Sequence, residues 1–350
     1  MSVRRATIAD VAREAGVAAS TASVVFSGKT PVSEQTRQRV IEAAASLGYT
    51  GPDPRAASLR RGRSGIVGVV FGDRLGTAFL DPVTTVMMDG LADALADLGS
   101  GLLLLRDDAA EGELTLNSAP VDAVVLIGCS TRMRDALDVV RSRGLPVVVI
   151  EGDAGEGVPQ IRLDNREGQA AIAHHLRELG HEDVVTVTLA LDARREAGWA
   201  EGVTAGEITV DVTRDRLAGV RDVFPDARIY VTRSSLVDEG YAAGQAVLAQ
   251  QPRPTAVIAQ SDLLAVGVVR AIRDAGLRVP EDISVTGFDG ISADGIAPLT
   301  LTTMVQPAAA KGRAAGAAIT AMLADAMPAS IHLTTTFRRG DTSAPPPPRS

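Results

Sequence analysis

Three short segments near the N-terminus decide the fold of this part of the chain: residues 7–16 (TIADVAREAG), 17–26 (VAASTASVVF) and 33–47 (SEQTRQRVIEAAASL). Each has the apolar spacing of a short amphipathic helix. The first two are separated by a turn of about three residues, which is the spacing of a helix-turn-helix. In that motif the second helix enters the major groove of DNA, so the segments predict a DNA-binding head.

The three helices can share one small core. Thr7 is placed to cap the first helix, with Asp10 three residues further on. Helical periodicity then puts six apolar side chains in the shared core: Ile8, Val11, Ala12, Ala15, Val17 and Val25.

Charge is divided unevenly along the chain. Residues 1–64 hold ten Lys and Arg against five Asp and Glu, whereas the rest of the chain holds 25 Lys and Arg against 38 Asp and Glu. The formal net charge of the whole chain is −8. A basic head on an acidic body is expected if only the head meets phosphates. A solvated helical head with an ordinary excess of arginine would give the same charges, so the helix spacing carries more weight.

The head and the segment after it resemble the LacI/GalR family of bacterial transcription regulators, through TIADVAREAGV, STAS, VSEQTRQRVIEAAASLGY and AASLRRGRSGIVGVV. The resemblance continues in the family's order through LDNREGQAAIAHHLRELGHEDVVTV, PTAVIAQSDLLAVGVVRAIRDAGLRVPEDISVTGFD and PLTLTTMVQP. It implies a homodimeric regulator, most often a repressor, that binds an inverted-repeat operator in double-stranded DNA and responds to a small-molecule effector.

Composition and length bound the remaining classes. The 350 residues, of which 45% are apolar and 22% charged, can bury a large core and one accessory domain. No stretch is long and apolar enough to span a membrane, and MSVRRATIAD lacks the apolar part of a signal peptide, so we expect a cytoplasmic protein. Cys129 is the only cysteine, which predicts a buried, inert thiol and neither disulfides nor a Cys-rich metal site. We expect no cofactor.

From residue 65 onward, short runs rich in Val and Ile alternate with helical stretches such as 89–98 and 168–179. The runs are uniformly apolar, which is typical of strands buried on both faces of a doubly wound parallel sheet. Their repetition predicts an α/β body of two similar lobes. The family resemblance implies lobes of the periplasmic-binding-protein kind, with the chain crossing between them three times.

These patterns predict four regions: a head at 1–50, a hinge at 51–64, a body at 65–342 and a disordered, proline-rich tail at 343–350. We expect the crossovers near 162–164, 290–294 and 325–329. Lobe 1 would then comprise about 65–163 and 293–325, and lobe 2 about 164–292 and 328–342.

The hinge segment 51–64 (GPDPRAASLRRGRS) has two prolines followed by four arginines. It can be a plain linker. The resemblance implies instead that 55–61 folds into a helix on operator DNA, with Arg55 among the DNA contacts and Leu59 wedged between base pairs from the minor groove. The family usually has Asn at the place of Asp53 and Arg at the place of Ala57, and one extra residue precedes Leu59.

The recognition helix is expected at 18–26. By resemblance, Ala19, Ser20 and Val24 occupy the base-reading positions. The other expected DNA contacts are Thr7, Thr21, Ser23, Ser27 and Ser33. Val24 stands where the family commonly has arginine, which leaves an apolar group suited to a thymine methyl. Ala18 replaces the family's serine cap, a loss of ~1 kcal/mol. The hydroxyls of Ser20 and Thr21 can alternatively serve only to cap this helix.

Effector chemistry is expected where the lobes face each other, outside the carboxyl ends of the strands. The residues that match the family's cleft ligands each lie at or just after an apolar run: Glu151, Ser261, Asp262, Asp289 and Gln306. Asp289 is the strongest candidate, and Asp262 can alternatively cap the helix at 263–275.

The family also has an arginine in an R-x-x-G pattern after the run VVTVTL, and both Arg195 and Arg216 fit it. We prefer Arg216, because RLAGVRDVFPDARIYV continues as helix, turn and strand, whereas Arg195 falls in an apparent insertion at 191–213. Such an arginine binds a carboxylate, a phosphate or paired hydroxyls, so a sugar or a nucleoside is a candidate effector. Trp199 in the insertion either covers the cleft or packs at its edge.

Other functions fit the sequence less well. GKT at 28–30 resembles the end of a phosphate-binding loop, but the first glycine of such a loop would be residue 23, which is Ser23. There is no G-x-S-x-G segment, and His174 and His175 precede an ordinary helical leucine, so we do not expect an enzyme. The alternative is a small-molecule binding or sensing protein of the same two-lobed fold that acts without DNA, against which the basic head argues.

Overall fold

The computed structural model describes residues 6–27, 30–51, 62–72, 75–106, 114–128, 132–292 and 294–348. It divides into two compact units, Met1–Gly65 and Ile66–Ser350. Two expected hinge contacts, Arg55 and Leu59, lie outside the described residues, as does Cys129.

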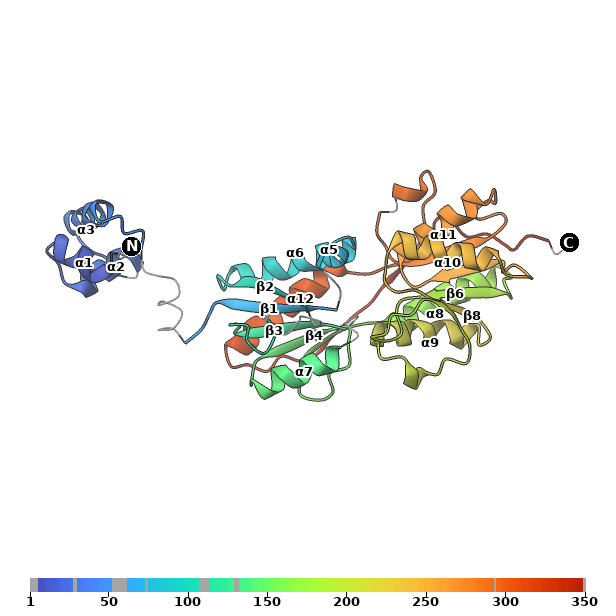
Figure 1. The fold of residues 1–350 in the computed structure, drawn as a ribbon, viewed down its shortest axis with the longest axis horizontal. Coiled ribbons are helices and arrows are strands. Elements are labelled where there is room, and N and C mark those ends of the chain that lie inside the picture. Colours follow the sequence, from blue (N-terminus) through green and yellow to red (C-terminus); the bar gives the residue numbers. More distant parts are fainter. Residues whose placement is uncertain are drawn as a thin grey trace. The chain divides into compact units, whose positions relative to one another are not determined.

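The described residues of the first unit form helices α1 (Ile8–Glu14), α2 (Ala19–Ser27) and α3 (Glu34–Ser46), shown in blue in Figure 1. All six expected core residues belong to one apolar cluster or pack against it, together with Ala22, Val40, Ala43, Ala44, Phe26 and Tyr49. The rings of Phe26 and Tyr49 meet edge to face with centroids 5.3 Å apart. The three-helix head with one shared core is confirmed.

The helix starts follow from local hydrogen bonds. The Thr7 hydroxyl accepts from the Asp10 amide at 3.3 Å while the Asp10 carboxylate accepts from the Thr7 amide at 3.0 Å, so the predicted cap of α1 is confirmed. Ser33 caps α3 by accepting from the Thr36 amide at 3.3 Å. Ala18 precedes α2 and, as expected, has no side-chain oxygen with which to cap it.

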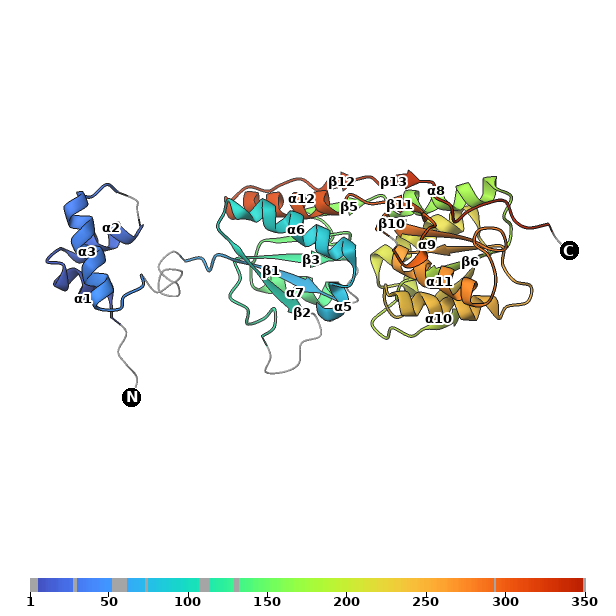
Figure 2. The ribbon, with the colours of Figure 1, turned by 90° about the horizontal axis from the view of Figure 1, so that it is seen from above.

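Lobe 1 of the second unit is a parallel sheet of order β12-β5-β4-β3-β1-β2. The bounds of its strands are β1 Ile66–Phe71, β2 Gly101–Arg106, β3 Ala123–Ile127, β4 Val147–Ile150, β5 Gln160–Leu163 and β12 Ile331–Leu333. Helices α6 (Pro82–Ala96) and α12 (Ala308–Leu323) cover one face, and α7 (Met133–Ser142) covers the other (Figure 2). The short α5 (Leu75–Ala78) follows β1.

Lobe 2 is a sheet of order β13-β11-β10-β9-β6-β8-β7, parallel except for its two edge strands β7 and β13. The bounds are β6 Val184–Thr188, β7 Gly198–Ala200, β8 Arg228–Val231, β9 Ala256–Ala259, β10 Ser284–Asp289, β11 Thr302–Val305 and β13 Thr336–Arg338. Helices α8 (Asn165–Glu178) and α9 (Asp211–Val223) pack on one face, and α10 (Val237–Leu248) and α11 (Asp262–Asp274) on the other. Two short 3-10 helices, η1 (Ala205–Glu207) and η2 (Asp294–Ile296), complete it.

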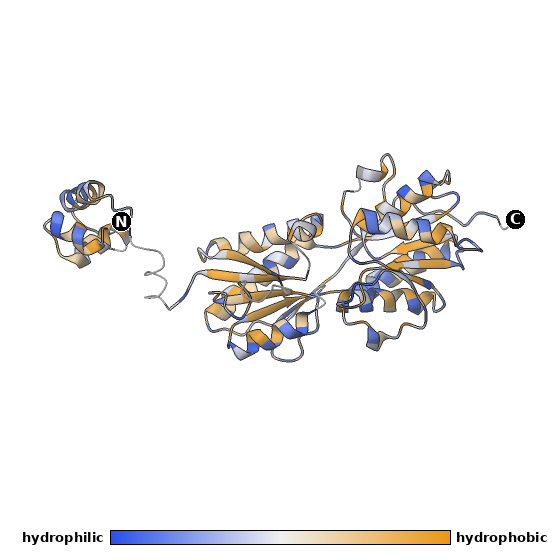
Figure 3. Ribbon diagram, in the orientation of Figure 1, coloured by the Kyte–Doolittle hydropathy of each residue, from blue (hydrophilic) through white to orange (hydrophobic). Residues whose placement is uncertain are grey.

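The central strands β1, β3, β4 and β9 are apolar along their length, and the sheets lie between helices with hydrophilic outer faces (Figure 3). This pattern is the expected one for sheets buried on both sides, and the doubly wound prediction is confirmed. In the described part of the chain, no helix has the length and apolar character needed to cross a membrane.

Two of the three expected crossovers are wrong. The first lies where predicted, between β5 in lobe 1 and α8 in lobe 2. After β10, however, the chain stays in lobe 2, forms η2 and returns as the neighbouring strand β11, so the second crossover lies at 306–307. Strand β12 then joins lobe 1 and β13 joins lobe 2, which places the third at 334–335. Residues 294–305 therefore belong to lobe 2, and 331–333 to lobe 1.

The expected disorder of the C-terminal segment is also wrong for residues 343–348. The hydroxyl of Ser343 is hydrogen-bonded to His175 and to Thr302, at 2.9 Å in each case. The carbonyl oxygen of Ala344 is hydrogen-bonded to Ser284 at 3.0 Å and to the ring of His181 at 2.8 Å. Side chains of lobe 2 thus anchor the start of this proline-rich segment.

Candidate functional site

A cavity of about 1050 Å³, including its open mouth, lies between the two lobes. Five of the six expected cleft residues line it: Glu151, Arg216, Ser261, Asp289 and Gln306. Glu151, Ser261, Asp289 and Gln306 lie at or just beyond the carboxyl ends of β4, β9, β10 and β11, where parallel strands present their side chains to a ligand. The structure therefore brings together residues that are far apart in the sequence.

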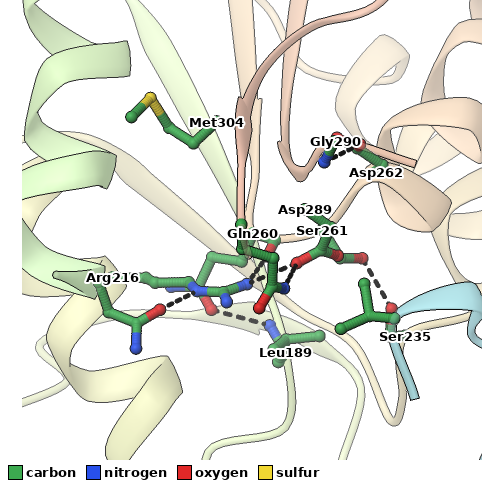
Figure 4. A network of polar contacts seen from close by, with 12 residues as sticks. Leu189, Arg216, Ser235, Gln260, Ser261, Asp262, Asp289, Gly290 and Met304 are labelled. Carbon is green, nitrogen blue, oxygen red and sulfur yellow. Dashed lines mark hydrogen bonds and ion pairs between the residues drawn. The ribbon is translucent and has the colours of Figure 1, made fainter. Parts of the chain in front are cut away.

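Asp262 is the exception, and its expected contact with the effector is corrected. Its buried carboxylate accepts from the amide of Gly290 at 2.7 Å (Figure 4), from the amide of Ile291 at 2.9 Å and from the Thr303 hydroxyl at 2.6 Å. Ser261 caps α11, so Asp262 does not cap it either. Because Ser261 takes the cap position, the next carboxylate turns toward 290–291 and holds the loop that follows Asp289.

Six polar side chains form a closed cycle of hydrogen bonds and ion pairs, called the polar ring below: Glu151, Asn165, Arg216, Asp289, Gln306 and Lys311. Glu151 and Lys311 come from lobe 1, and Arg216 and Asp289 from lobe 2. Asn165 and Gln306 lie at the first and second crossovers. The ring therefore joins both lobes through the segments that connect them.

Two amide side chains orient the charged groups of the polar ring. Asn165 donates from Nδ2 to Glu151 Oε1 at 2.9 Å and accepts at Oδ1 from Arg216 Nε at 2.8 Å. In the same way, Gln306 donates from Nε2 to Asp289 Oδ1 at 2.6 Å and accepts at Oε1 from Lys311 Nζ. Each amide thus bridges one cation and one carboxylate, and this fixes which end of the amide carries oxygen.

Two direct ion pairs close the ring. Lys311 Nζ donates to Glu151 Oε2, and Arg216 Nη1 lies 3.6 Å from Asp289 Oδ1. The Arg216 guanidinium also lies over the ring of Phe288, 3.7 Å from its centroid. Glu151, at φ 55°, and Asp289, at φ 128°, hold backbone conformations that side-chain-bearing residues seldom adopt. Such strain is concentrated at ligand sites, where the surrounding contacts maintain it.

Burial and neighbouring charges set the protonation of the carboxyl groups. Burial acts to raise the pKa of Glu151, but the charges of Lys311 and Arg216 outweigh it and lower that pKa, so Glu151 is ionised at neutral pH. Burial raises the pKa of Asp289 well above its usual range, against the opposing charge of Arg216. Burial likewise raises the pKa of Asp81, which also lines the pocket. The pocket therefore combines a fixed carboxylate with carboxyl groups that can carry a proton.

Both arginines weighed for the R-x-x-G position line the pocket, in different ways. Arg216 is buried inside the polar ring beside Asp289, as preferred. Arg195 lies at the rim, where its Nη1 donates to the Arg233 carbonyl at 3.2 Å and its Nη2 to the Gly72 carbonyl at 2.7 Å. Trp199 packs edge to face on Tyr230 at 5.4 Å and is not among the pocket's lining residues, so it packs at the edge.

Sequence reasoning missed Lys311 and Asp81. Lys311 stands in the helical segment AAAKGRAAGAA, where an isolated lysine is typical of a solvated face. In the structure, α12 packs closely against α6 at Gly312, where a Cβ would lie 1.9 Å from the carbonyl oxygen of Met87. This close packing buries the neighbouring Lys311. The glycines spaced along α12 are the signal that could have identified a closely packed helix face.

On the head, α2 presents its expected contact residues on one side. Ala19, Ser20, Ser23 and Ser27 are exposed, and Thr21 and Val24 are half-buried. Ala22 is fully buried in the core of the head, which fixes the orientation of the helix. Thr7 and Ser33 are exposed at the starts of α1 and α3, and both hydroxyls already form cap hydrogen bonds.

Comparisons with known proteins agree with both parts of the chain. Residues 7–51 match the family described as bacterial regulatory proteins, lacI family, and residues 173–343 match the periplasmic binding protein-like domain. The HTH-type transcriptional regulator Rv3575c of Mycobacterium tuberculosis is 33% identical over 98% of both chains. The HTH-type transcriptional regulator IpsA of Corynebacterium glutamicum is 31% identical over 97% of this chain and 98% of its own.

Solved structures show the same architecture. A LacI-family transcriptional regulator from Corynebacterium glutamicum superposes with a TM-score of 0.71 at 27% identity, over 98% of this chain and 100% of the other. The transcriptional regulator CelR in complex with cellobiose gives 0.65 at 25% identity, over 97% and 100%. The lac repressor dimer bound to operator gives 0.74 at 21% identity, over 97% and 100%, a likeness of fold.

Proposed function

Because the chain belongs to the LacI family of bacterial regulatory proteins, we propose that it is a homodimeric repressor whose operator binding is controlled by a small molecule held on the polar ring. The polar ring is the observation that carries this proposal, since it places a desolvated set of donors and acceptors across the two lobes. A protein that binds chromosomal DNA in this way acts in the cytoplasm, and no catalytic step is needed.

The chemistry of the pocket favours a neutral, hydroxyl-rich effector. Lys311 pairs with Glu151, and Arg216 lies 3.6 Å from the Asp289 carboxyl group, so each basic group of the polar ring already has an acidic partner and the pocket does not require a charged ligand. Asp289 and Arg216 offer adjacent acceptor and donor groups, the arrangement that binds paired hydroxyls. Sugars and nucleosides meet these requirements. The complex of the related CelR with cellobiose supports the same class.

Effector control follows from the position of the ring. Gln306 lies on the second crossover and Asn165 begins α8 directly after the first, so a ligand that shifts the ring acts on the connections between the lobes. Such a ligand favours one of two relative lobe arrangements according to its affinity for each. A change in lobe arrangement within a dimer alters the spacing of the two heads and hence operator affinity.

Operator recognition would use α2 in the major groove, with Ala19, Ser20 and Val24 toward the bases and the surrounding hydroxyls toward the phosphates. Two heads related by a twofold axis fit an inverted repeat. Exposed apolar side chains around the start of α6, namely Phe79, Leu80 and Val86, offer a surface that a second copy can cover. Arg55 and Leu59 would contribute the minor-groove contacts.

Selection of DNA from a randomised library by the full-length chain tests the regulator directly. We expect enrichment of an inverted repeat, and no enrichment by the fragment that starts at residue 65. If the full-length chain enriches no sequence, the protein acts without DNA as a binding or sensing protein. A thermal-shift screen of sugars, polyols, nucleosides and small acids tests the effector class, because a ligand at 100 times its dissociation constant adds ~2.7 kcal/mol.

A further inference from the structure

Lys311 is an unusual residue in this chain. Of the 35 basic residues, 33 are arginine, and the two lysines are Lys29 in the head and Lys311. Lys311 is only 1% exposed, yet it lines the pocket between the lobes. A buried lysine needs a paired charge and hydrogen-bond acceptors, so its position requires an explanation.

The ammonium group of Lys311 has more donors than protein acceptors. It carries three N–H groups. Within the part of the chain that the structure describes, two side chains accept from it, Glu151 through Oε2 and Gln306 through Oε1. One N–H is therefore left for a group inside the pocket.

Lys311 and Asp289 lie close together at the pocket, because the same amide of Gln306 contacts both residues. Its Oε1 accepts from Lys311 while its Nε2 donates to Asp289 Oδ1 at 2.6 Å. No described side chain donates to the second oxygen of Asp289. A hydroxyl next to Gln306 can accept from Lys311, and the same or a neighbouring hydroxyl can donate to Asp289.

Building on the proposed function, we propose that Lys311 is a direct effector ligand that selects molecules with an oxygen acceptor beside a donor that reaches Asp289. A compact ammonium suits this position. Gly312 brings α12 against the backbone of Met87, and a lysine ammonium offers three donors at one point, of which Glu151 and Gln306 take two.

The first test needs no effector and uses formaldehyde as its probe. Reductive methylation of the folded, full-length protein with formaldehyde and a borane is followed by peptide mass spectrometry, with Lys29 as the internal reference. We expect Lys311 to be methylated while the protein is folded, because formaldehyde is small enough to enter the pocket, and a bulky biotin ester to leave it unmodified. Methylation of Lys311 only in urea would show that the ammonium does not face the pocket and would overturn the proposal.

The second test compares variants on a fixed panel of D-ribose, D-glucose, cellobiose, ribitol and adenosine. Any panel member that raises the melting temperature of the wild type should bind Lys311→Met at least tenfold more weakly. Because Lys311→Met leaves Glu151 buried without its cation, the double variant with Glu151→Gln keeps the ring neutral and serves as the folded comparison. Arg313→Met, which removes an exposed cation two residues along α12, is the matched control and should bind normally.

Unchanged affinity in both Lys311 variants would remove Lys311 from the effector site. If no panel member stabilises the wild type, the proposed effector class is wrong, and the methylation result still decides whether Lys311 faces the pocket. The two proposals therefore fail in distinguishable ways.

Discussion

Arg195 in lobe 2 donates a hydrogen bond from Nη2 to the carbonyl oxygen of Gly72 in lobe 1, 2.7 Å away. A second contact of the same kind lies nearby, where Asp211 accepts from the amide of Asp153 at 2.9 Å. Both lobe 2 residues belong to the insertion at 191–213. The sequence indicates only that this segment is an irregular insertion, and in the structure it provides two direct hydrogen bonds between the lobes.

We predict that Arg195→Ala opens the body. Loss of the bond to Gly72 removes one direct link between the lobes, so small-angle scattering should give a larger radius of gyration for residues 65–350. Arg194→Ala is the matched control, because Arg194 pairs at 2.7 Å with Asp192 inside its own segment. An unchanged radius for Arg195→Ala would mean that this contact does not hold the lobes together.

Arg216→Ala and Asp289→Ala should each abolish the response to effector. Each change leaves buried partners in the polar ring without a hydrogen bond, at about 1 to 3 kcal/mol. Ligand-induced shifts in melting temperature measure the response, and operator binding should survive. Arg221→Ala on the same helix removes a bond to the carbonyl of Val203, remote from the ring, and should respond normally.

A normal response in Arg216→Ala together with a lost response in Arg195→Ala would reverse the choice between the two arginines. Both line the pocket, so the comparison is between two residues with access to the ligand.

The sequence predicts well what depends on local pattern. Apolar periodicity identifies the core of the head and the buried strands, and strand ends locate Glu151, Asp289 and Gln306 at the pocket. It predicts poorly what depends on pairing between distant segments. Strand β12 is a three-residue edge strand whose side chains are exposed or half-buried, so IHL carries little strand signal and the third crossover is misplaced.

Side-chain direction is the second limit. Asp262 follows an apolar run as Asp289 does, yet the cap formed by Ser261 turns it to the backbone of 290–291. Lys311 shows the reverse, since the close approach of α12 to α6 buries a residue whose local sequence is that of an exposed helix. Neither outcome can be read from spacing alone.

Asp262 should make stability depend on pH in a specific window. Burial raises its pKa to about 6, above the unfolded value of 3.8, so the folded state holds its proton at a higher pH than the unfolded chain does. Stability from this group is complete below pH 3.8 and is lost as the pH rises through 6, by on the order of 3 kcal/mol.

Urea unfolding of the wild type and of Asp262→Asn from pH 4 to pH 7 isolates this contribution, since other groups cancel in the difference. The variant mimics the protonated carboxyl, because its amide keeps one oxygen that can accept from Gly290 and Ile291, so the wild type should lose stability relative to the variant as the pH rises from 4 to 7. A constant difference across this range would show that Asp262 titrates normally.

Operator affinity should fall steeply as salt is raised. The head and hinge, residues 1–64, carry ten basic residues against five acidic ones, and each phosphate contact releases condensed counterions. Binding titrations between low and physiological salt should give a straight log-log plot of negative slope. A flat plot would contradict phosphate binding by the head, whereas the fragment from residue 65 should keep its effector binding and lose DNA binding at every salt concentration.

Val24→Arg should change the base preference at one position of each half-site. Val24 is half-buried on the side of α2 that also presents Ser20 and Ser23, and it can offer a thymine methyl only an apolar contact. An arginine can instead donate two hydrogen bonds to guanine, at about 1 to 3 kcal/mol of discrimination. Selection from a randomised library, with the wild type in parallel, should therefore shift toward guanine. Ala22→Arg cannot serve as a control for this test, because Ala22 is fully buried and its replacement would unfold the head. An unchanged site with unchanged affinity in Val24→Arg would mean that residue 24 does not face the bases.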